Sequence, residues 1–184
     1  MKNIKVISSL LLAILIMTLV SCSNNGSNTN NTSSNPTTKE EYANYLEERY
    51  NYYFGDSSIY NNYDIYEEDF TFNGTTEEFI TAYDDSYINL KSDLESFKAD
   101  LKNFVKSGTP EVDKLNAEVI TDIDKAIVSV DDYNAGVAEK TKDYATLAKD
   151  EVIKGFRSIG KASHDAMDNL ENLVDNAKDR LGID

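Results

Sequence analysis

The chain has 184 residues, a formal net charge of −15 and no tryptophan. Nucleic-acid binders neutralise phosphates with Lys and Arg, so 33 acidic against 18 basic side chains argue against that class of partner. A single cysteine leaves no disulfide within the chain, and a single histidine leaves no pair for a histidine-based metal or acid–base site.

Residues 1–22 have the organisation of an export signal. Lys2 and Lys5 supply the positive charge, and residues 10–20 form an apolar run broken only by Thr18. This run is shorter than the stretch of about 20 apolar residues that a transmembrane helix needs. The pattern therefore predicts a signal peptide over residues 1–21.

Cys22 follows a short motif, Leu19-Val20-Ser21, with a leucine three positions before it and a small residue directly before it. This resembles the lipobox of bacterial lipoproteins. The resemblance implies acylation of the Cys22 thiol, as by diacylglyceryl or palmitate chains, and cleavage between Ser21 and Cys22. We expect a lipid anchor on the extracytoplasmic side of the cell membrane, or in the outer membrane of an organism with two membranes. The alternative is an incidental cysteine at an ordinary signal-peptide junction.

Residues 22–38 comprise the lipidated cysteine and a tether of Asn, Ser, Thr, Gly and Pro, with no charge and no large apolar side chain after Cys22. Such a composition cannot offset the entropy of ordering, so the tether is predicted to be disordered. A flexible coil of this length spans about 20–24 Å. Residues 39–184 are then expected to form a single helical domain.

The first helix is predicted over residues 39–54. Residues 38–41 read Thr-Lys-Glu-Glu, which is a capping box, and Gly55 follows the last apolar residue. One face carries apolar and aromatic side chains at helical spacing, at Tyr42, Leu46, Tyr50 and Tyr53.

Residues 55–74 show no regular period but are rich in aromatic side chains. Eight of the twelve tyrosines lie within residues 42–66. Tyrosine rings stack on sugars or peptides while their hydroxyls form hydrogen bonds, so Tyr60, Tyr63 and Tyr66 are candidates for a ligand surface. The alternative is that these aromatics pack onto the helices and bind nothing.

Two long helices are predicted next, over residues 76–106 and 110–134. A capping box, Thr-Thr-Glu-Glu at 75–78, begins the helix at 76–106. The connection to the next helix is so short that the two helices are expected to form an antiparallel hairpin. The first seam has the heptad period and consists of Tyr83, Tyr87, Leu90, Leu94, Phe97, Leu101 and Phe104. The second consists of Val112, Leu115, Val119, Ile123, Ala126, Val130 and Tyr133.

The C-terminal helix is predicted over residues 137–181, after a break at 134–136; a break at 155–160 is the alternative. Its stripe has a mean spacing of 11/3, typical of a nearly straight helix. Its members are Val137, Thr141, Tyr144, Ala148, Val152, Gly155, Ile159, Ser163, Ala166, Leu170, Leu173, Ala177 and Leu181. Phe156, Met167 and Val174 are expected to flank it. His164, beside Asp165, is expected on the helix surface.

These patterns predict an all-α fold: an elongated antiparallel bundle of three long helices plus one short N-terminal helix, after a disordered tether. No phosphate loop, nucleophile elbow or cofactor motif occurs in the sequence, so we expect neither an enzyme nor a bound cofactor or metal. The leading hypothesis is a surface-displayed interaction module for another envelope protein, a wall polymer or a host molecule. The alternatives are a binder of a sugar, peptide or cation that uses residues 42–72, and a structural or protective envelope protein.

Overall fold

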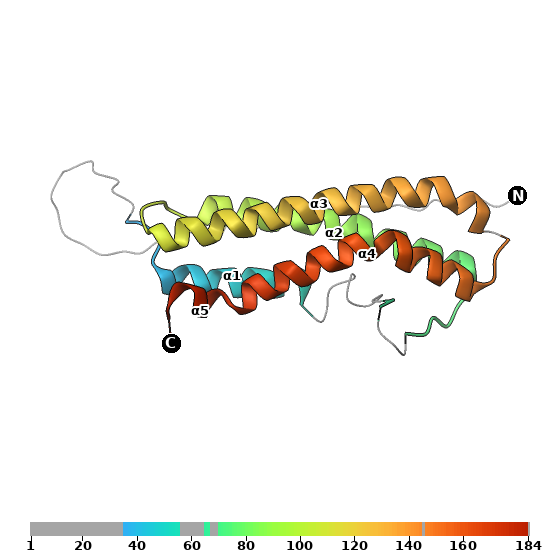
Figure 1. Ribbon diagram of the computed structural model, residues 1–184, viewed down its shortest axis with the longest axis horizontal. Helices are drawn as coiled ribbons and strands as arrows, with labels where there is room; N and C mark the ends of the chain where they lie inside the picture. Colours follow the sequence, from blue (N-terminus) through green and yellow to red (C-terminus); the bar gives the residue numbers. More distant parts are fainter. Residues whose placement is uncertain (1–34, 56–64, 67–69, 145, 184) are drawn as a thin grey trace, which may run out of the picture. The chain divides into compact units, whose positions relative to one another are not determined.

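The computed structural model describes residues 35–55, 65–66, 70–144 and 146–183, and the side chains of 139–143 are not among the described ones. All regular secondary structure in these residues is helical, which confirms the all-α fold class (Figure 1). The helices are α1 (Lys39–Phe54), α2 (Thr76–Phe104), α3 (Pro110–Tyr144), α4 (Lys149–Asp175) and α5 (Ala177–Leu181).

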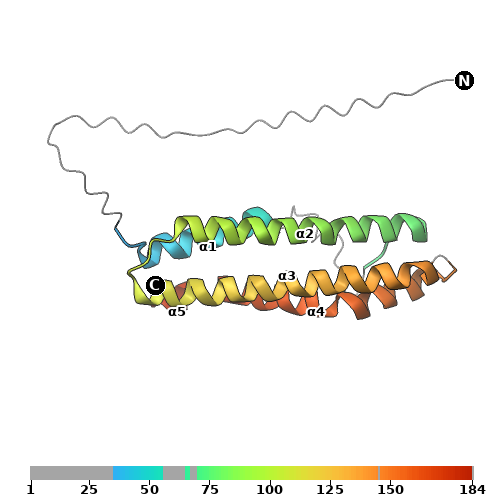
Figure 2. The ribbon, with the colours of Figure 1, turned by 90° about the horizontal axis from the view of Figure 1, so that it is seen from above.

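The four long helices form an up-down-up-down bundle in which α3 packs along both α2 and α4 (Figures 1 and 2). Two ion pairs show that α2 and α3 are antiparallel. Lys91 contacts Asp131 at 2.5 Å, and Lys98, later in α2, contacts Asp124, earlier in α3. The predicted hairpin of these two helices is therefore confirmed.

Both predicted capping boxes are present. The Thr38 hydroxyl accepts from the Glu41 amide at 3.2 Å while the Glu41 carboxylate accepts from the Thr38 amide at 2.9 Å. Thr75 and Glu78 repeat the arrangement at 3.2 and 2.8 Å. Reciprocal capping satisfies two amides that have no partner within a helix, and this explains why α1 and α2 begin where they do.

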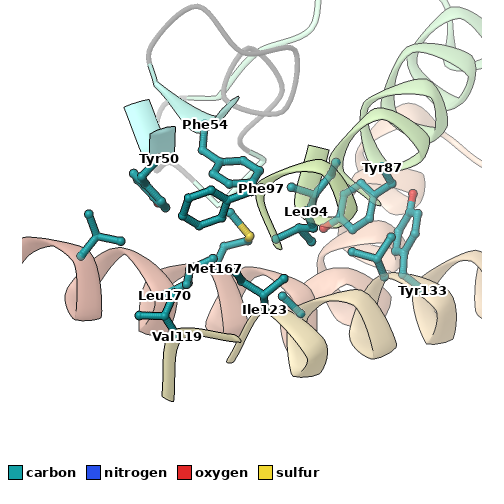
Figure 3. Close-up of a cluster of buried hydrophobic side chains, with 14 of the residues drawn as sticks. Tyr50, Phe54, Tyr87, Leu94, Phe97, Val119, Ile123, Tyr133, Met167 and Leu170 are labelled. Carbon is teal, nitrogen blue, oxygen red and sulfur yellow. The ribbon is translucent and has the colours of Figure 1, made fainter. Parts of the chain in front are cut away.

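The α2–α3 seam forms the centre of the core (Figure 3). All seven predicted positions of α3 are buried, and so are six of the seven in α2; Phe104 is half-buried. The rings of Tyr87 and Tyr133 stack across this seam with centroids 3.7 Å apart. Large aromatic rings at facing heptad positions therefore hold the hairpin together.

The predicted break at 134–136 is wrong, and so is the alternative at 155–160. Helix α3 continues through Gly136 to Tyr144, and the chain reverses before α4 begins at Lys149. Gly136 is a contact point: a Cβ there would lie 2.9 Å from the Ile159 side chain of α4. Glycine at this position therefore allows the two helices to approach closely and does not end the helix.

The predicted C-terminal stripe is confirmed in part. Val152, Ser163, Leu170, Ala177 and Leu181 are buried as expected, whereas Gly155, Ile159, Ala166 and Leu173 are only half-buried. Gly160 and three residues that were expected to flank the stripe are also buried: Phe156, Met167 and Val174. The buried face of α4 is therefore centred between the predicted stripe and its expected flank. A second interruption at Asn176 separates α5.

Helix α1 covers only part of the length of the bundle. Helix α1 has 16 residues and α2 has 29, so α1 covers about 24 Å of a length of about 43 Å. Beyond α1, aromatic side chains of the non-helical segment pack against the bundle, with Phe70 and Phe72 both beside Phe79. The Lys149 ammonium binds the carbonyls of Phe72 and Gly74 at 2.6 and 3.2 Å. The irregular segment is thus tied to α4 through its backbone.

Gly160 provides a test of this close packing. A Cβ on Gly160 would lie 2.7 Å from the hydroxyl of the buried Tyr87 and 2.9 Å from that of Tyr66. Although alanine favours a helix over glycine by about 1 kcal/mol, Gly160→Ala is expected to lower the free energy of unfolding by about 1 kcal/mol, because overpacking a filled core costs more. Urea denaturation measures the difference.

The matched control is Ser158→Ala, an exposed position on the same helix, which should leave stability unchanged or slightly raised. A Gly160→Ala protein as stable as the Ser158→Ala protein would contradict the packing role of this glycine.

Candidate functional site

The residues expected to carry function divide between the described and the undescribed parts of the chain. Ser21 and Cys22, the expected cleavage and lipidation positions, lie outside the described residues, as do Tyr60 and Tyr63. Tyr66 alone of the three candidate tyrosines is described. The following geometry therefore concerns Tyr66 and the surfaces and buried groups of the folded unit.

Tyr66 is docked on α4. Its hydroxyl donates to the Arg157 carbonyl at 2.7 Å, and its ring stacks on His164 with centroids 4.1 Å apart and an interplanar angle of 11°. The Arg157 side chain in turn donates to the Ile65 carbonyl. The polar end of Tyr66 is therefore engaged within the protein. His164, expected at the surface, is half-buried under this ring, and its Nε2 lies 3.6 Å from an Asp168 oxygen.

The start of the folded unit is latched to the α2–α3 connection. The Thr37 amide donates to the Lys106 carbonyl at 2.9 Å, and the Lys106 amide donates to the Thr37 hydroxyl at 2.8 Å. The Thr109 hydroxyl completes the set by donating to the Thr37 carbonyl at 2.7 Å. Thr37 is buried, with 5% of its surface exposed. We name these three residues the Thr37 latch.

Nothing in the sequence indicated the latch, because its partners lie about 70 positions apart and each is an ordinary loop residue. Gly108 contributes through its backbone: its φ of +132° lies in the region that favours glycine, and a Cβ there would lie 2.7 Å from Pro36. Thr37 lies within residues 22–38, which were predicted to be a disordered tether, so that prediction is wrong at its C-terminal end: three hydrogen bonds and burial order Thr37.

A layer of tyrosines fills the bundle where α2, α3 and α4 meet. Tyr83, Tyr87 and Tyr133 are buried together with Phe156, and their rings contact one another at centroid distances of 3.7 to 6.1 Å. Burial strongly raises the pKa of the Tyr83 and Tyr133 hydroxyls, so neither ionises near neutral pH. The rings of the layer fill the core, and the Tyr83 and Tyr133 hydroxyls stay protonated at physiological pH.

Asp84 lies beside this layer and accepts a hydrogen bond from the Tyr133 hydroxyl at 3.0 Å. Burial raises the pKa of its carboxyl, the Tyr133 hydrogen bond opposes this, and the Asp85 charge adds to the increase. Among the described residues, no group of three or more His, Cys, Asp or Glu side chains could hold a metal ion. Asp84 thus acts as a hydrogen-bond acceptor at the edge of the core.

Three adjoining hollows follow the groove between α3 and the α4–α5 end, each with a volume of about 400 to 480 Å³ and each lined by Leu173. Two ion pairs lie at their rims, because Arg180 contacts Glu118 and Lys125 contacts Asp122. These hollows are open to solvent and lack convergent catalytic groups, so the groove is a shallow surface feature.

Aromatic side chains also gather on the outer surface where α1 meets α2. We define the α1–α2 aromatic patch by Tyr45, Arg49, Tyr52 and Tyr53 of α1 and by Asp100 and Phe104 of α2. The Tyr45 and Phe104 rings stack at 3.7 Å, and the Arg49 guanidinium lies 4.6 Å from the Tyr52 centroid. Asp100 joins the two helices by contacting Arg49 and accepting from the Tyr53 hydroxyl, both at 2.9 Å.

Comparison with protein-family models, with curated protein sequences and with solved structures gives no match for this chain. Among the described helices, none combines the length and the apolar character required to cross a membrane. Any functional inference therefore depends on the residues and geometry described above.

Asp84 generates a pH-dependent prediction. Because burial raises its folded-state pKa above the unfolded value, the ionised carboxylate reduces stability at neutral pH, and this loss disappears as the pH falls through the raised pKa. Asp84→Asn is therefore expected to be more stable than wild type at pH 7. The difference should shrink as the pH approaches the ordinary Asp value of about 3.9. Urea denaturation across this range, with Glu95→Gln as an exposed control on the same helix, measures it. A difference that grows on acidification would contradict this account.

Thr37→Val tests the latch, because valine keeps the shape of threonine but removes the hydroxyl that Lys106 uses. Loss of one buried hydrogen bond should lower the free energy of unfolding by about 1 kcal/mol, and the Lys106 amide proton should exchange faster with solvent. The matched control is Thr121→Val, the same substitution at an exposed position of α3, which should leave exchange at Lys106 unchanged. Exchange at Lys106 that is no faster in Thr37→Val than in this control would show that the hydroxyl does not hold the latch.

Proposed function

We propose that this chain is an exported lipoprotein, held in the membrane by acylated Cys22, whose helical bundle is an interaction module on the extracytoplasmic side. The observation that carries the proposal is the motif Leu19-Val20-Ser21-Cys22 at the end of a basic and apolar N-terminal segment. Two or more acyl chains anchor a protein firmly, because each buried CH₂ contributes about 0.8 kcal/mol to partitioning.

The Thr37 latch supports a tethered arrangement. It fixes the first residues of the folded unit to the α2–α3 connection, so the chain that leads back to Cys22 leaves the bundle at this end. The opposite end of the bundle carries the turn at 146–148 and the beginning of α2. That opposite end is therefore the part of the bundle furthest from the point where the tether is attached.

The surface chemistry supports interaction as the task of the bundle. After loss of Lys2 and Lys5 with the signal, the formal charge becomes about −17, and residues 39–107 contribute 16 acidic against 6 basic side chains. An acidic surface keeps the domain away from anionic lipid and attracts cationic partners. In the described part of the chain, the hollows are shallow and the buried hydroxyls do not ionise at neutral pH, which favours binding over catalysis.

Cys22→Ala tests the anchor. The variant should incorporate no labelled palmitate, and any processed form should leave the membrane fraction, because the thiol is the acylation site. Fractionation of cells with an antibody against the bundle measures this, and Ser27→Ala in the tether is the control that should stay membrane-bound. Retention of processed Cys22→Ala protein in the membrane would disprove the lipoprotein assignment.

A further inference from the structure

The α1–α2 aromatic patch differs from the rest of the described surface. Tyr52 is the most exposed of the large hydrophobic side chains, with 70% of its surface accessible. Tyr45, Tyr53 and Phe104 are half-buried beside it, so four rings lie on one outer surface. Tyrosine and arginine are the residue types that dominate binding energy at protein interfaces. A cluster of this composition is therefore suited to binding, whereas a lone exposed aromatic is not informative.

Other exposed surfaces fit a partner less well. Ile88 on α2 and Val128 on α3 are single exposed apolar side chains. The two helices that carry them are joined nearby by the Lys91–Asp131 and Lys98–Asp124 ion pairs. The hollows at Leu173 have two ion pairs at their rims, Lys125–Asp122 and Arg180–Glu118, and none of their described lining residues is aromatic. The α1–α2 aromatic patch combines exposed rings with carboxylates at its rim. The negative charge of these carboxylates favours a basic ligand over an acidic one.

The patch is preorganised and its own charges cancel. Arg49 is held between the Tyr52 and Tyr53 rings, with its guanidinium carbon 4.6 and 5.4 Å from their centroids, and its charge is matched by Asp100. Tyr53 is fixed by its hydrogen bond to the same carboxylate. Side chains that are held in place before binding lose little entropy on binding, which favours affinity.

The surroundings of the patch are acidic. Glu41 and Glu48 lie exposed on α1, one turn before Tyr45 and Tyr52 respectively. Burial, more than any charge, raises the pKa of the Tyr45 hydroxyl; the Asp100 and Glu48 charges add to the increase and the Arg49 charge opposes it. Aromatic ring faces with carboxylates beside them attract ammonium and guanidinium groups and repel anionic polymers and anionic lipid.

We propose that the α1–α2 aromatic patch docks a lysine- and arginine-rich segment of a partner protein. The basic side chains contact the exposed Tyr52 ring and pair with the Glu48 carboxylate, one turn before it on α1. This proposal rests on the proposed function of the bundle as an interaction module and names the chemistry of its partner. Charge complementarity with an acidic chain selects this partner over an acidic peptide.

Titration of the full-length chain in detergent micelles with a short oligolysine peptide tests the proposal, with oligoglutamate as the control peptide. Oligolysine should bind and oligoglutamate should not. Tyr52→Leu should weaken oligolysine binding about fivefold, because leucine keeps apolar area but has no π face. Tyr52→Phe should retain binding, and Glu48→Gln should weaken it. Circular dichroism confirms that each variant stays folded, as expected for exposed positions.

Glu95→Gln is the matched charge control, since Glu95 is an exposed carboxylate of α2 that acts on Lys91 and lies outside the patch. If Glu95→Gln and Glu48→Gln weakened binding equally, and Tyr52→Leu had no effect, net charge alone would explain the binding and the proposal would be wrong. Binding to neutral oligosaccharides or anionic vesicles in place of oligolysine would also overturn it. The titration tests the patch and does not depend on where the chain resides in the cell. A negative titration would therefore contradict the patch proposal alone, and Cys22→Ala would still test the lipid anchor.

Discussion

The close approach of α3 and α4, with tyrosine hydroxyls lying over glycines, is the constraint on which the rest of the bundle depends. A Cβ at Gly136, Gly155 or Gly160 would lie within 3 Å of a side chain on a packed neighbour. Gly136 and Gly155 bring α3 and α4 together, against Ile159 and Tyr144, and Gly160 leaves room for the Tyr87 hydroxyl of the tyrosine layer. The large aromatic side chains between α2 and α3 are therefore accommodated by small residues at the α3–α4 contact, and together they fill the core.

Helix α1 is too short to cover the whole apolar face of α2, α3 and α4, and two parts of the chain cover this face. Helix α1 covers one end, and the described residues 65–66 and 70–74 pack further along, where cations of α4 bind their backbone carbonyls. A non-helical segment over an apolar core must satisfy its own carbonyls. Lys149 and Arg157 do this, so part of the positive charge of α4 is committed to structure.

Function, in our proposal, concentrates near the end where the chain enters the bundle. The Thr37 latch ties the first folded residues to the α2–α3 connection, and the α1–α2 aromatic patch begins within three turns of that point on α1. A partner held by Tyr52 and Glu48 would therefore lie on the same helix that follows the tether. The acidic charge of residues 39–107 favours a basic partner there and disfavours contact with anionic lipid.

Caps and heptad seams are local signals, so the helical class, both capping boxes, α1 and the α2–α3 hairpin could be predicted from the sequence. The lipobox was also visible there, and it stays a prediction along with Tyr60 and Tyr63. The end of α3, the buried face of α4 and the docking of Tyr66 on α4 depend on tertiary contacts, which local patterns do not carry. Glycine indicates a helix break when a stretch of sequence is considered alone, and only a packed neighbour such as Ile159 turns Gly136 into a contact. The latch and the aromatic patch were out of reach for the same reason, since each joins residues distant in the chain.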